Sequence, residues 1–293
     1  MVMTIVTYLH LSRSRIMGAA DRTVQDVDGE LADNDWKIRH FGKSRLLAYA
    51  GHTNYGKEIA DGVQRSIRAD LPFNGYVSLV EREYKKARER AKEIVLRECG
   101  SGKRRSRVRA IFSRPFDPQG FYVELMISGF DGNVGGFRTY HVTGFGDKRV
   151  TGDSRFGFIG YESKKSARVL REHLQKYGSE EDVPDDAGAE ILLKAVDRSR
   201  RVRLGNGRPF GEIQLLIVDS HGHAEEFQPN ETTYLLRAVR EHKSHPEIAD
   251  EVYLKRVFKE IVLGKKSSGV VWDTTPKELR DKLGLIAHTD MRI

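Results

Sequence analysis

Two kinds of hydrophobic periodicity divide this chain into blocks of strands and blocks of helices. Residues 4–11 and 15–20 alternate apolar side chains with polar or β-branched ones, and a polar turn at residues 12–14 separates them. Alternation with a period of two is typical of strands, so these residues predict a β-hairpin. The same reasoning predicts a second hairpin over residues 36–50, with a glycine-containing turn at residues 42–44.

After the second hairpin the pattern changes to a helical period. Apolar side chains recur every four residues, which places them on one face of a helix, at Ile59, Val63, Ile67 and Leu71. Residues 80–95 repeat this pattern and have a heavily charged opposite face. The run of residues 71–75 contains a proline and a glycine, so we expect it to separate the two helices.

The second half of the chain repeats this order of blocks. The predicted elements are strands at 121–128, 137–143 and 156–160, helices at 167–177 and 191–199, and strands at 212–218 and 224–227. Neither a doubly wound α/β fold nor a β-sandwich has strands, two helices, strands, two helices and strands in this order. The prediction is an α+β fold of four αββα layers, in which two sheets lie between two pairs of helices.

Two segments stand apart from this pattern. Residues 100–119 are basic and contain two prolines, so we expect an exposed loop or insertion. Residues 229–293 are predicted to be helical again, with candidate helices at 234–241, 246–263 and 276–283. This C-terminal stretch has too few apolar residues to form a core of its own. We therefore expect one domain over residues 1–228, with residues 229–293 as a helical extension packed on it.

Composition narrows the class of protein. Of the 293 residues, 39% are hydrophobic and 31% are charged. No run approaches the ~20 apolar residues that a membrane-spanning helix needs. The chain has a single cysteine, Cys99, and no secretory signal pattern at its start, which is typical of proteins of the reducing cytoplasm. We therefore expect a cytoplasmic protein without membrane contact.

The net charge of +8 is concentrated in part in two basic clusters, at residues 103–109 and 198–203. Basic clusters can bind nucleic acid or acidic partners, but they also occur as solvated loops and helix faces. No zinc-finger, ribonucleoprotein or helix-turn-helix pattern accompanies them, so we favour the solvated surface and expect no nucleic-acid partner. The contrasting hypothesis, a nucleic-acid-binding module, predicts an affinity that falls steeply with salt.

A small set of polar positions near the start carries the candidate chemistry. Asp21 closes the second predicted strand, Lys37 follows sixteen residues later, and Gly51 ends an apolar strand fourteen residues after that. A lysine ammonium lowers the pKa of a nearby hydroxyl, an aspartate fixes that lysine, and a backbone N–H at a glycine can face an oxyanion. Thr4 lies just upstream, and a threonine with a free α-amine can use that amine as its base. Acyl transfer from an amide needs such a set: a nucleophile, a base, a group that tunes the pair and an oxyanion donor.

These residues and their separations resemble the N-terminal nucleophile hydrolases of the proteasome β-subunit type, in particular the bacterial proteasome-related (HslV-like and Anbu-like) branch. The resemblance implies an αββα fold and a threonine peptidase that uses Thr4 after removal of the leading residues. In it, Asp21 and Lys37 tune the nucleophile, and the Gly51 amide binds the oxyanion. It further implies a peptide or unfolded protein as substrate, no metal or organic cofactor, and a homo-oligomeric ring. Whether an ATP-dependent unfoldase acts with it stays open.

Two supporting positions differ from the family pattern. The family has a serine in a Gly-Ser turn before the third helix, and this chain has Tyr161 after Gly160. The family also has an aspartate before the late buried strand, and this chain has Asn206 there. Tyr161 can donate a hydrogen bond through its phenol, and Asn206 keeps hydrogen bonding without the charge. Both are candidate supporting residues.

Several interpretations stay open at this level. Thr4 falls on the nucleophile position of the family only if the first hairpin is one residue longer than the family's. If it is two residues longer, Met3 falls on that position instead. Asp21 could simply cap a strand, and Lys37 could be a surface lysine. The alternatives to a peptidase are a catalytically silent assembly subunit and an amidase acting on small amides. The two histidines of residues 221–223 lie in a predicted turn without the further ligands that a metal site needs.

Overall fold

Two antiparallel sheets form the centre of the molecule. The computed structural model describes residues 5–25, 31–33, 36–98, 121–143, 147–150, 155–160, 163–178, 182–200 and 212–263. The first sheet has the strand order β10-β1-β2-β11-β12. Its strands are β1 (Ile5–Ser12), β2 (Arg15–Asp21), β10 (Phe156–Gly160), β11 (Ile213–Asp219) and β12 (Ala224–Glu226).

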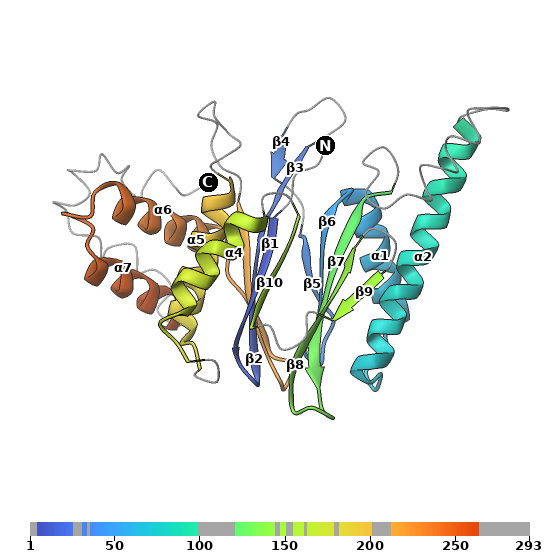
Figure 1. The fold of residues 1–293 in the computed structure, drawn as a ribbon, viewed down its shortest axis with the longest axis horizontal. Coiled ribbons are helices and arrows are strands. Elements are labelled where there is room, and N and C mark those ends of the chain that lie inside the picture. The colour runs from blue at the N-terminus through green and yellow to red at the C-terminus, as the bar shows by residue number, and fades with distance from the viewer. Residues whose placement is uncertain are drawn as a thin grey trace.

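The second sheet faces the first and has the order β5-β6-β7-β8-β9 (Figure 1). Its strands are β5 (Ile38–His40), β6 (Arg45–Gly51), β7 (Val123–Asp131), β8 (Gly136–Thr143) and β9 (Asp147–Val150). A separate pair, β3 (Thr23–Gln25) and β4 (Leu31–Asp33), follows β2 directly and projects beyond the two sheets.

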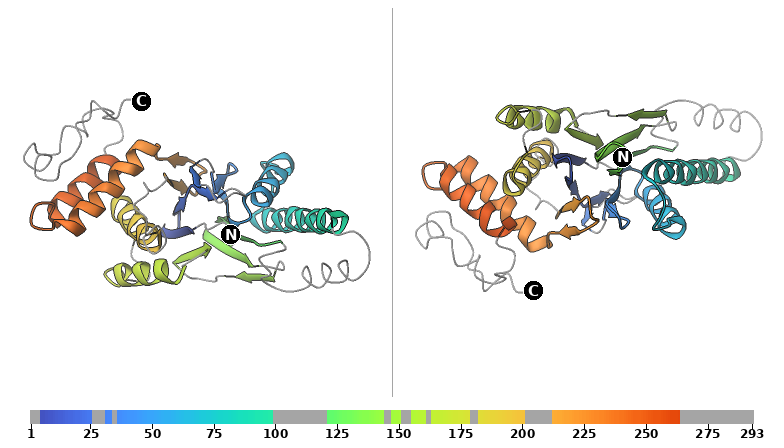
Figure 2. Two further views of the ribbon diagram at one scale, coloured as in Figure 1. Left: turned by 90° about the horizontal axis from the view of Figure 1, so that it is seen from above. Right: turned by 90° about the horizontal axis from the view of Figure 1, so that it is seen from below.

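Helices cover the outer face of each sheet. The helices α1 (Thr53–Ser66) and α2 (Phe73–Glu98) pack on β6 and β7 of the second sheet. On the other side, α4 (Ser163–Leu174) and α5 (Asp185–Arg200) pack together and cover β10, β1 and β2. Figure 2 shows the two helix groups on opposite sides of the strands. Beyond α5 lie α6 (Pro229–Ser244), α7 (Glu251–Phe258) and the π-helical turn Lys259–Leu263.

Three hydrophobic clusters explain this arrangement. Successive side chains of a strand point to opposite faces of its sheet, so each sheet contributes to two of the clusters. In β1, Leu9 and Leu11 belong to a cluster shared with α5, α6 and α7, whereas Val6 and Tyr8 belong to a cluster between the two sheets. The remaining cluster joins the second sheet to α1 and α2. Each sheet is therefore buried on both faces, and the strands read as nearly continuous apolar runs.

The predicted strands, hairpins and helices correspond closely to the observed ones, with a few differences in extent. The pairs β1–β2 and β5–β6 are the two expected hairpins. The strands β3, β4 and β9 were not predicted, because each is only three or four residues long and shows no clear alternation. The break between the first two helices covers residues 67–72 and not 71–75, since α1 ends at Ser66 and α2 begins at Phe73; Ile67 and Leu71, expected on the first helix, follow its end. The segments 100–119 and 276–283 lie outside the described residues.

The described part of the C-terminal extension packs on the rest of the chain. The helix α6 begins at Pro229 with a capping box, in which the Gln228 side chain accepts the N–H of Glu231 and the Glu231 carboxylate accepts the N–H of Gln228 at 2.8 Å. It contacts α5 and β11, and α7 contacts α5. The division at residue 229 stays a prediction, since one apolar cluster runs across it. Within the described residues, no helix combines the length and apolarity needed to cross a membrane.

Candidate active site

Asp21, Lys37 and Gly51 lie at the same end of the two facing sheets. Asp21 is the last residue of β2 and lies opposite Ile213 of β11. Lys37 directly precedes β5, and its carbonyl accepts the N–H of Tyr49 at 3.1 Å. Gly51 ends β6, two residues beyond Tyr49. In Figure 1 this is the upper end of the strands, where β3 and β4 leave the first sheet.

Two contacts bring the lysine segment against the strand that carries the aspartate. The guanidinium of Arg22, one residue after Asp21, lies over the ring of Trp36 at 4.2 Å from its centroid. Trp36 directly precedes the candidate lysine. On the other side of that lysine, Ile38 packs on β2, with its Cδ1 atom 3.0 Å from the place that a Cβ on Gly18 would take. Packing between the two sheets therefore brings the segment around Lys37 next to β2, although sixteen residues separate Lys37 from Asp21 in the sequence.

Both charged residues are buried. Lys37 is 0% exposed and Asp21 is 6% exposed, and each has an interaction partner. A surface lysine would keep its ammonium group in water, so the burial rules out that interpretation of Lys37. An ammonium group is removed from water only where acceptors compensate for its lost hydration. Such a buried cation acts strongly on neighbouring groups, because the surrounding dielectric constant is low.

Gly51 has a backbone that only glycine allows at this place. Its φ is +101°, and a Cβ added to it would lie 2.2 Å from the carbonyl oxygen of Tyr122. That same carbonyl accepts the N–H of His52 at 2.8 Å, so it cannot move away without breaking a hydrogen bond. The chain therefore turns out of β6 at a fixed angle, which fixes the direction of the Gly51 peptide groups.

Glu124 of β7 is a further residue of this end that the sequence did not single out. It lies opposite Ala50 in the register of β6 and β7. Its carboxylate accepts the N–H of Gly160 in the other sheet at 2.7 Å and the hydroxyl of Tyr122 at 3.1 Å. Burial, followed by the charge of Glu124, raises the pKa of the Tyr122 hydroxyl well above its usual range. The only sequence signal for Glu124 is a charged residue inside an alternating strand.

Gln214 of β11 is a second residue that the sequence did not single out. Its side-chain amide bonds to both backbone groups of Ile38, next to the candidate lysine. Gln214 lies opposite Ala20 of β2, one residue before Asp21. Like Glu124, it joins one sheet to the other at the same end of the strands.

The other predicted site residues, Thr4, Tyr161 and Asn206, lie outside the described residues. The neighbours of two of them are described. Ile5, the first residue of β1, lies opposite Gly160, the last residue of β10. Gly160 has a φ of +95°. The described strand ends that lead to positions 4 and 161 are therefore adjacent in the first sheet.

One extra residue interrupts the pairing of β1 with β2. His10 lies opposite Ile16 and Ser12 lies opposite Arg15, so Leu11 has no partner in β2. Two residues of one strand facing one of the other form a β-bulge. The Leu11 carbonyl is satisfied outside the hairpin, where it accepts the N–H of Val183 at 2.8 Å. The first hairpin thus contains one residue more than a regular ladder would need.

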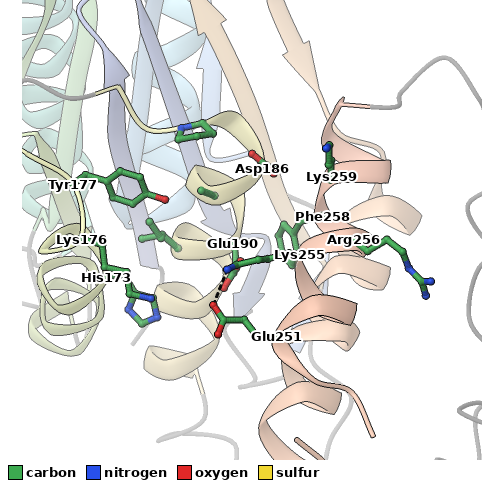
Figure 3. Close-up of a pocket in the computed structure, with 13 residues that line it drawn as sticks. His173, Lys176, Tyr177, Asp186, Glu190, Glu251, Lys255, Arg256, Phe258 and Lys259 are labelled. Carbon is green, nitrogen blue, oxygen red and sulfur yellow. Dashed lines mark ion pairs between the residues drawn. The ribbon is translucent and has the colours of Figure 1, made fainter.

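A separate cavity lies away from this end, between α4, the start of α5 and α7 (Figure 3). Its volume is about 520 Å³. Tyr177 and Phe258 contribute aromatic surface, and the ammonium group of Lys255 pairs with the Glu251 carboxylate at 2.9 Å. None of Asp21, Lys37 and Gly51 lines it. It belongs to the contact between the C-terminal helices and the rest of the chain.

The turn after β11 contains His221 and His223, and both are exposed. His223 contacts the Asp219 carboxylate through Nδ1 at 3.0 Å, and that carboxylate also accepts the N–H groups of His221 and His223. Burial, the largest single influence, acts to raise the pKa of Asp219, but the hydrogen bonds from His223 and His221 and the charge of His223 together lower it below its usual value. Within the described residues, no three His, Cys, Asp or Glu side chains are grouped to hold a metal ion.

Comparison with solved structures identifies a shared fold. An "Anbu (Gly-1) mutant" from Hyphomicrobium sp. strain MC1 has a TM-score of 0.54 and 16% identity, over 83% of this chain and 97% of that chain. "Anbu (ancestral beta-subunit)" from Yersinia bercovieri has a TM-score of 0.57 and 15% identity, over 84% and 95%. The "Helical Assembly of the Anbu Complex" from Pseudomonas aeruginosa has a TM-score of 0.57 and 19% identity, over 82% and 92%.

No protein-family model and no curated protein matches the sequence. At identities of 15–19% the likeness to the solved structures concerns the fold. This chain is thus a mixed helix–strand protein with antiparallel sheets and the fold of an ancestral β-subunit. Activity has to be argued from its own residues.

Proposed function

We propose that this chain is a proteasome-like threonine peptidase with an αββα N-terminal nucleophile hydrolase fold. The observation that carries the proposal is the meeting of Asp21, the fully buried Lys37 and the positive-φ Gly51 at one end of the two sheets. The likeness in fold to Anbu, an ancestral β-subunit, supports the same assignment.

In the proposed reaction, removal of residues 1–3 frees the α-amine of Thr4. This amine takes the proton of the Thr4 hydroxyl as the oxygen attacks the scissile carbonyl carbon. Lys37 remains charged, fixed by Asp21, and favours the developing alkoxide. The Gly51 N–H donates to the oxyanion of the tetrahedral intermediate.

Collapse of that intermediate breaks the C–N bond. The leaving amine takes the proton from the Thr4 ammonium group, and an ester on Thr4 remains. Water then attacks the ester with the same α-amine as base, which releases the carboxylic acid and restores the hydroxyl. Every proton taken by the amine is returned, so the cycle needs no cofactor or metal.

The bulge at Leu11 supports Thr4 as the nucleophile. The proposal needs a first hairpin one residue longer than the family spacing, and β1 contains one unpaired residue at Leu11. The extra residue lies one position before the turn at residues 12–14 where the sequence placed it. In the described part of β1, Val6 and Tyr8 pack between the sheets, and Leu9 and Leu11 pack on the helix side.

The proposed substrate is a peptide or an unfolded protein, and the proposed active form is a homo-oligomer. The assembly part rests on the likeness to a chain that forms a helical assembly of the Anbu complex. Light scattering of the purified chain tests it, and a monomer at micromolar concentration contradicts it.

Intact mass spectrometry of the full chain, before and after treatment with a β-lactone or an epoxyketone, tests the nucleophile. We expect loss of residues 1–3 and one covalent adduct. Thr4→Ala should abolish the adduct. Thr7→Val is the matched control, because Thr7 lies fully buried inside β1 and its hydroxyl has no hydrogen-bond partner among the described residues. It should be labelled like the native chain.

The other outcomes select the alternatives. A full-length chain without an adduct indicates a catalytically silent assembly subunit. A labelled chain that hydrolyses small acyl-amides but no peptide is an amidase with the same nucleophile. An adduct that survives Thr4→Ala contradicts the assignment of the nucleophile.

A further inference from the structure

Gln214 in β11 presents its side-chain amide to the backbone of β5 in the opposite sheet. Its Oε1 accepts the N–H of Ile38 at 2.9 Å, and its Nε2 donates to the Ile38 carbonyl at 2.8 Å. Gln214 is only 2% exposed and Ile38 only 4%. A single side chain therefore satisfies both backbone groups of one buried residue.

Ile38 needs this partner because β5 is the edge strand of its sheet. In an antiparallel pair, the backbone groups of successive residues point alternately toward and away from the neighbouring strand. The Lys37 carbonyl bonds to Tyr49 of β6, so the groups of Ile38 point away from β6. Among the described strands, none pairs with that free edge. A buried N–H or carbonyl without a partner costs roughly 1–3 kcal/mol.

The amide of Gln214 thus replaces one peptide unit of a missing neighbouring strand. Its position links the two parts of the candidate site, since Gln214 lies opposite Ala20 and next to the residue that faces Asp21. Lys37 is held on one side by β6 and on the other, through Ile38, by the strand pair that ends in Asp21. A shift of Ile38 would move the buried lysine by a similar amount.

Glu226 fixes which way the amide points. Its Oε1 accepts a second bond from Gln214 Nε2 at 2.8 Å. A carboxylate can only accept hydrogen bonds, so the nitrogen of the amide must lie on the side of Glu226 and of the Ile38 carbonyl. The oxygen is then left for the Ile38 N–H. The three residues form a short chain in which each N–H has one defined acceptor.

We propose that Gln214 is a positioning residue that sets the place of Lys37 relative to Asp21 and the nucleophile. It acts through the backbone of Ile38 and touches no reacting atom. The proposal rests on the proposed function for its catalytic consequence. The holding of the Lys37 segment itself can be measured without any activity.

The experiment compares Gln214→Leu with the native chain and with Gln64→Leu, a control on the exposed side of α1. Leucine keeps the volume of the side chain and removes both hydrogen bonds. The first measurement is hydrogen exchange by mass spectrometry over residues 36–41. We expect exchange at least about tenfold faster in Gln214→Leu, since one lost hydrogen bond of this kind corresponds to roughly that factor. Gln64→Leu should be unchanged.

The second measurement is the rate of Thr4 labelling by a β-lactone as a function of pH. A displaced ammonium group no longer disfavours protonation of the α-amine. Gln214→Leu should therefore label about tenfold more slowly at pH 7, with its half-maximal rate at a higher pH. Loss of stability alone would lower the amplitude and leave that pH unchanged.

The outcomes separate the two proposals. An unlabelled native chain contradicts the peptidase, and hydrogen exchange then decides alone whether Gln214 holds the lysine segment. Unchanged exchange in Gln214→Leu overturns the positioning role. Faster exchange with a native labelling rate and pH dependence also overturns it, because the bond is then structural only. If Gln214→Leu does not fold, Glu226→Gln provides the same test with a smaller expected change.

Discussion

The two ends of the paired sheets are held together in different ways. At the end with Asp21 and Lys37, the described cross-sheet hydrogen bonds come from side chains, those of Gln214 and Glu124. At the opposite end the acceptors are backbone carbonyls of the first sheet. There the Phe137 N–H donates to the Arg13 carbonyl of the other sheet at 3.0 Å, and the Ser44 hydroxyl donates to the Asp219 carbonyl.

The difference shows which parts of the fold depend on particular residues. A backbone hydrogen bond between turns survives most substitutions, because every residue except proline supplies the same groups. The side-chain bonds at the site end require an amide and a carboxylate at two given positions. The turn end can therefore vary in sequence while it closes the sandwich, and the site end can keep its geometry only with these side chains.

Among substitutions at the two ends, we expect that of the buried Lys37 to change the rate of Thr4 labelling most. Lys37→Met removes the cation beside the proposed nucleophile and leaves Asp21 without it, so Thr4 labelling should slow by about 10²–10³-fold. Lys43→Met is the matched control, because Lys43 lies in the exposed turn at the opposite end, and it should label at the native rate. Labelling kinetics with a circular dichroism check of folding measure both. Equal rates for the two variants would remove Lys37 from the site.

Glycine substitutions test the rigidity of the two ends. Gly51→Ala meets both a φ of +101° and a carbonyl oxygen 2.2 Å from the new Cβ, so it should lower the free energy of unfolding by roughly 2–4 kcal/mol. Gly135→Ala, in the turn between β7 and β8, has a φ of +67° and open space around the new Cβ. It should lose only about 1–2 kcal/mol.

Urea denaturation of both glycine variants gives these values directly. Gly51→Ala should in addition lose Thr4 labelling, since its N–H is redirected, whereas Gly135→Ala should keep it. Equal losses of stability at the two glycines would show that the close contact with Tyr122 relaxes at no cost.

His10, which lies between the two ends, should make the free energy of unfolding depend on pH. Burial, followed by the charge of Arg155, lowers the pKa of His10 from 6.5 to about 4, and its Nε2 contacts the Thr139 hydroxyl at 3.1 Å. The folded state therefore keeps His10 neutral where the unfolded state binds a proton. Stability is fully present above pH 6.5 and falls as the pH drops through 4, by about 3 kcal/mol in total.

Urea denaturation between pH 7.5 and pH 4 measures this loss. His10→Gln keeps a hydrogen-bonding side chain that does not titrate, so between about pH 6.5 and pH 4 its free energy of unfolding should fall less steeply by up to about 1.4 kcal/mol per pH unit. Above pH 7 the two curves should run parallel. Parallel curves over the whole range would mean that His10 titrates alike in the folded and unfolded chain.

The sequence predicted those features that repeat along the chain or stand at fixed separations. Alternation located β1, β2, β6 and β7, and a four-residue period located α1 and α2, because a buried face imposes its period on many residues. Spacing, together with the resemblance to proteasome β-subunits, selected Asp21, Lys37 and Gly51. Gln214 and Glu124 could not be found in this way. Their partners, Ile38 and Gly160, lie far away in the sequence and become neighbours only when the two sheets pack.

The bulge at Leu11 has a consequence for how such chains are recognised. Two positions on opposite sides of the bulge are separated by one residue more along the chain than along the sheet. Chemistry depends on the count along the sheet, whereas a search for fixed residue separations uses the count along the chain. If Thr4 is the nucleophile, as proposed, a search with rigid spacing between it and Asp21 therefore rejects this sequence. A search that permits one additional residue in each hairpin retains it, together with any relative that carries a similar irregularity.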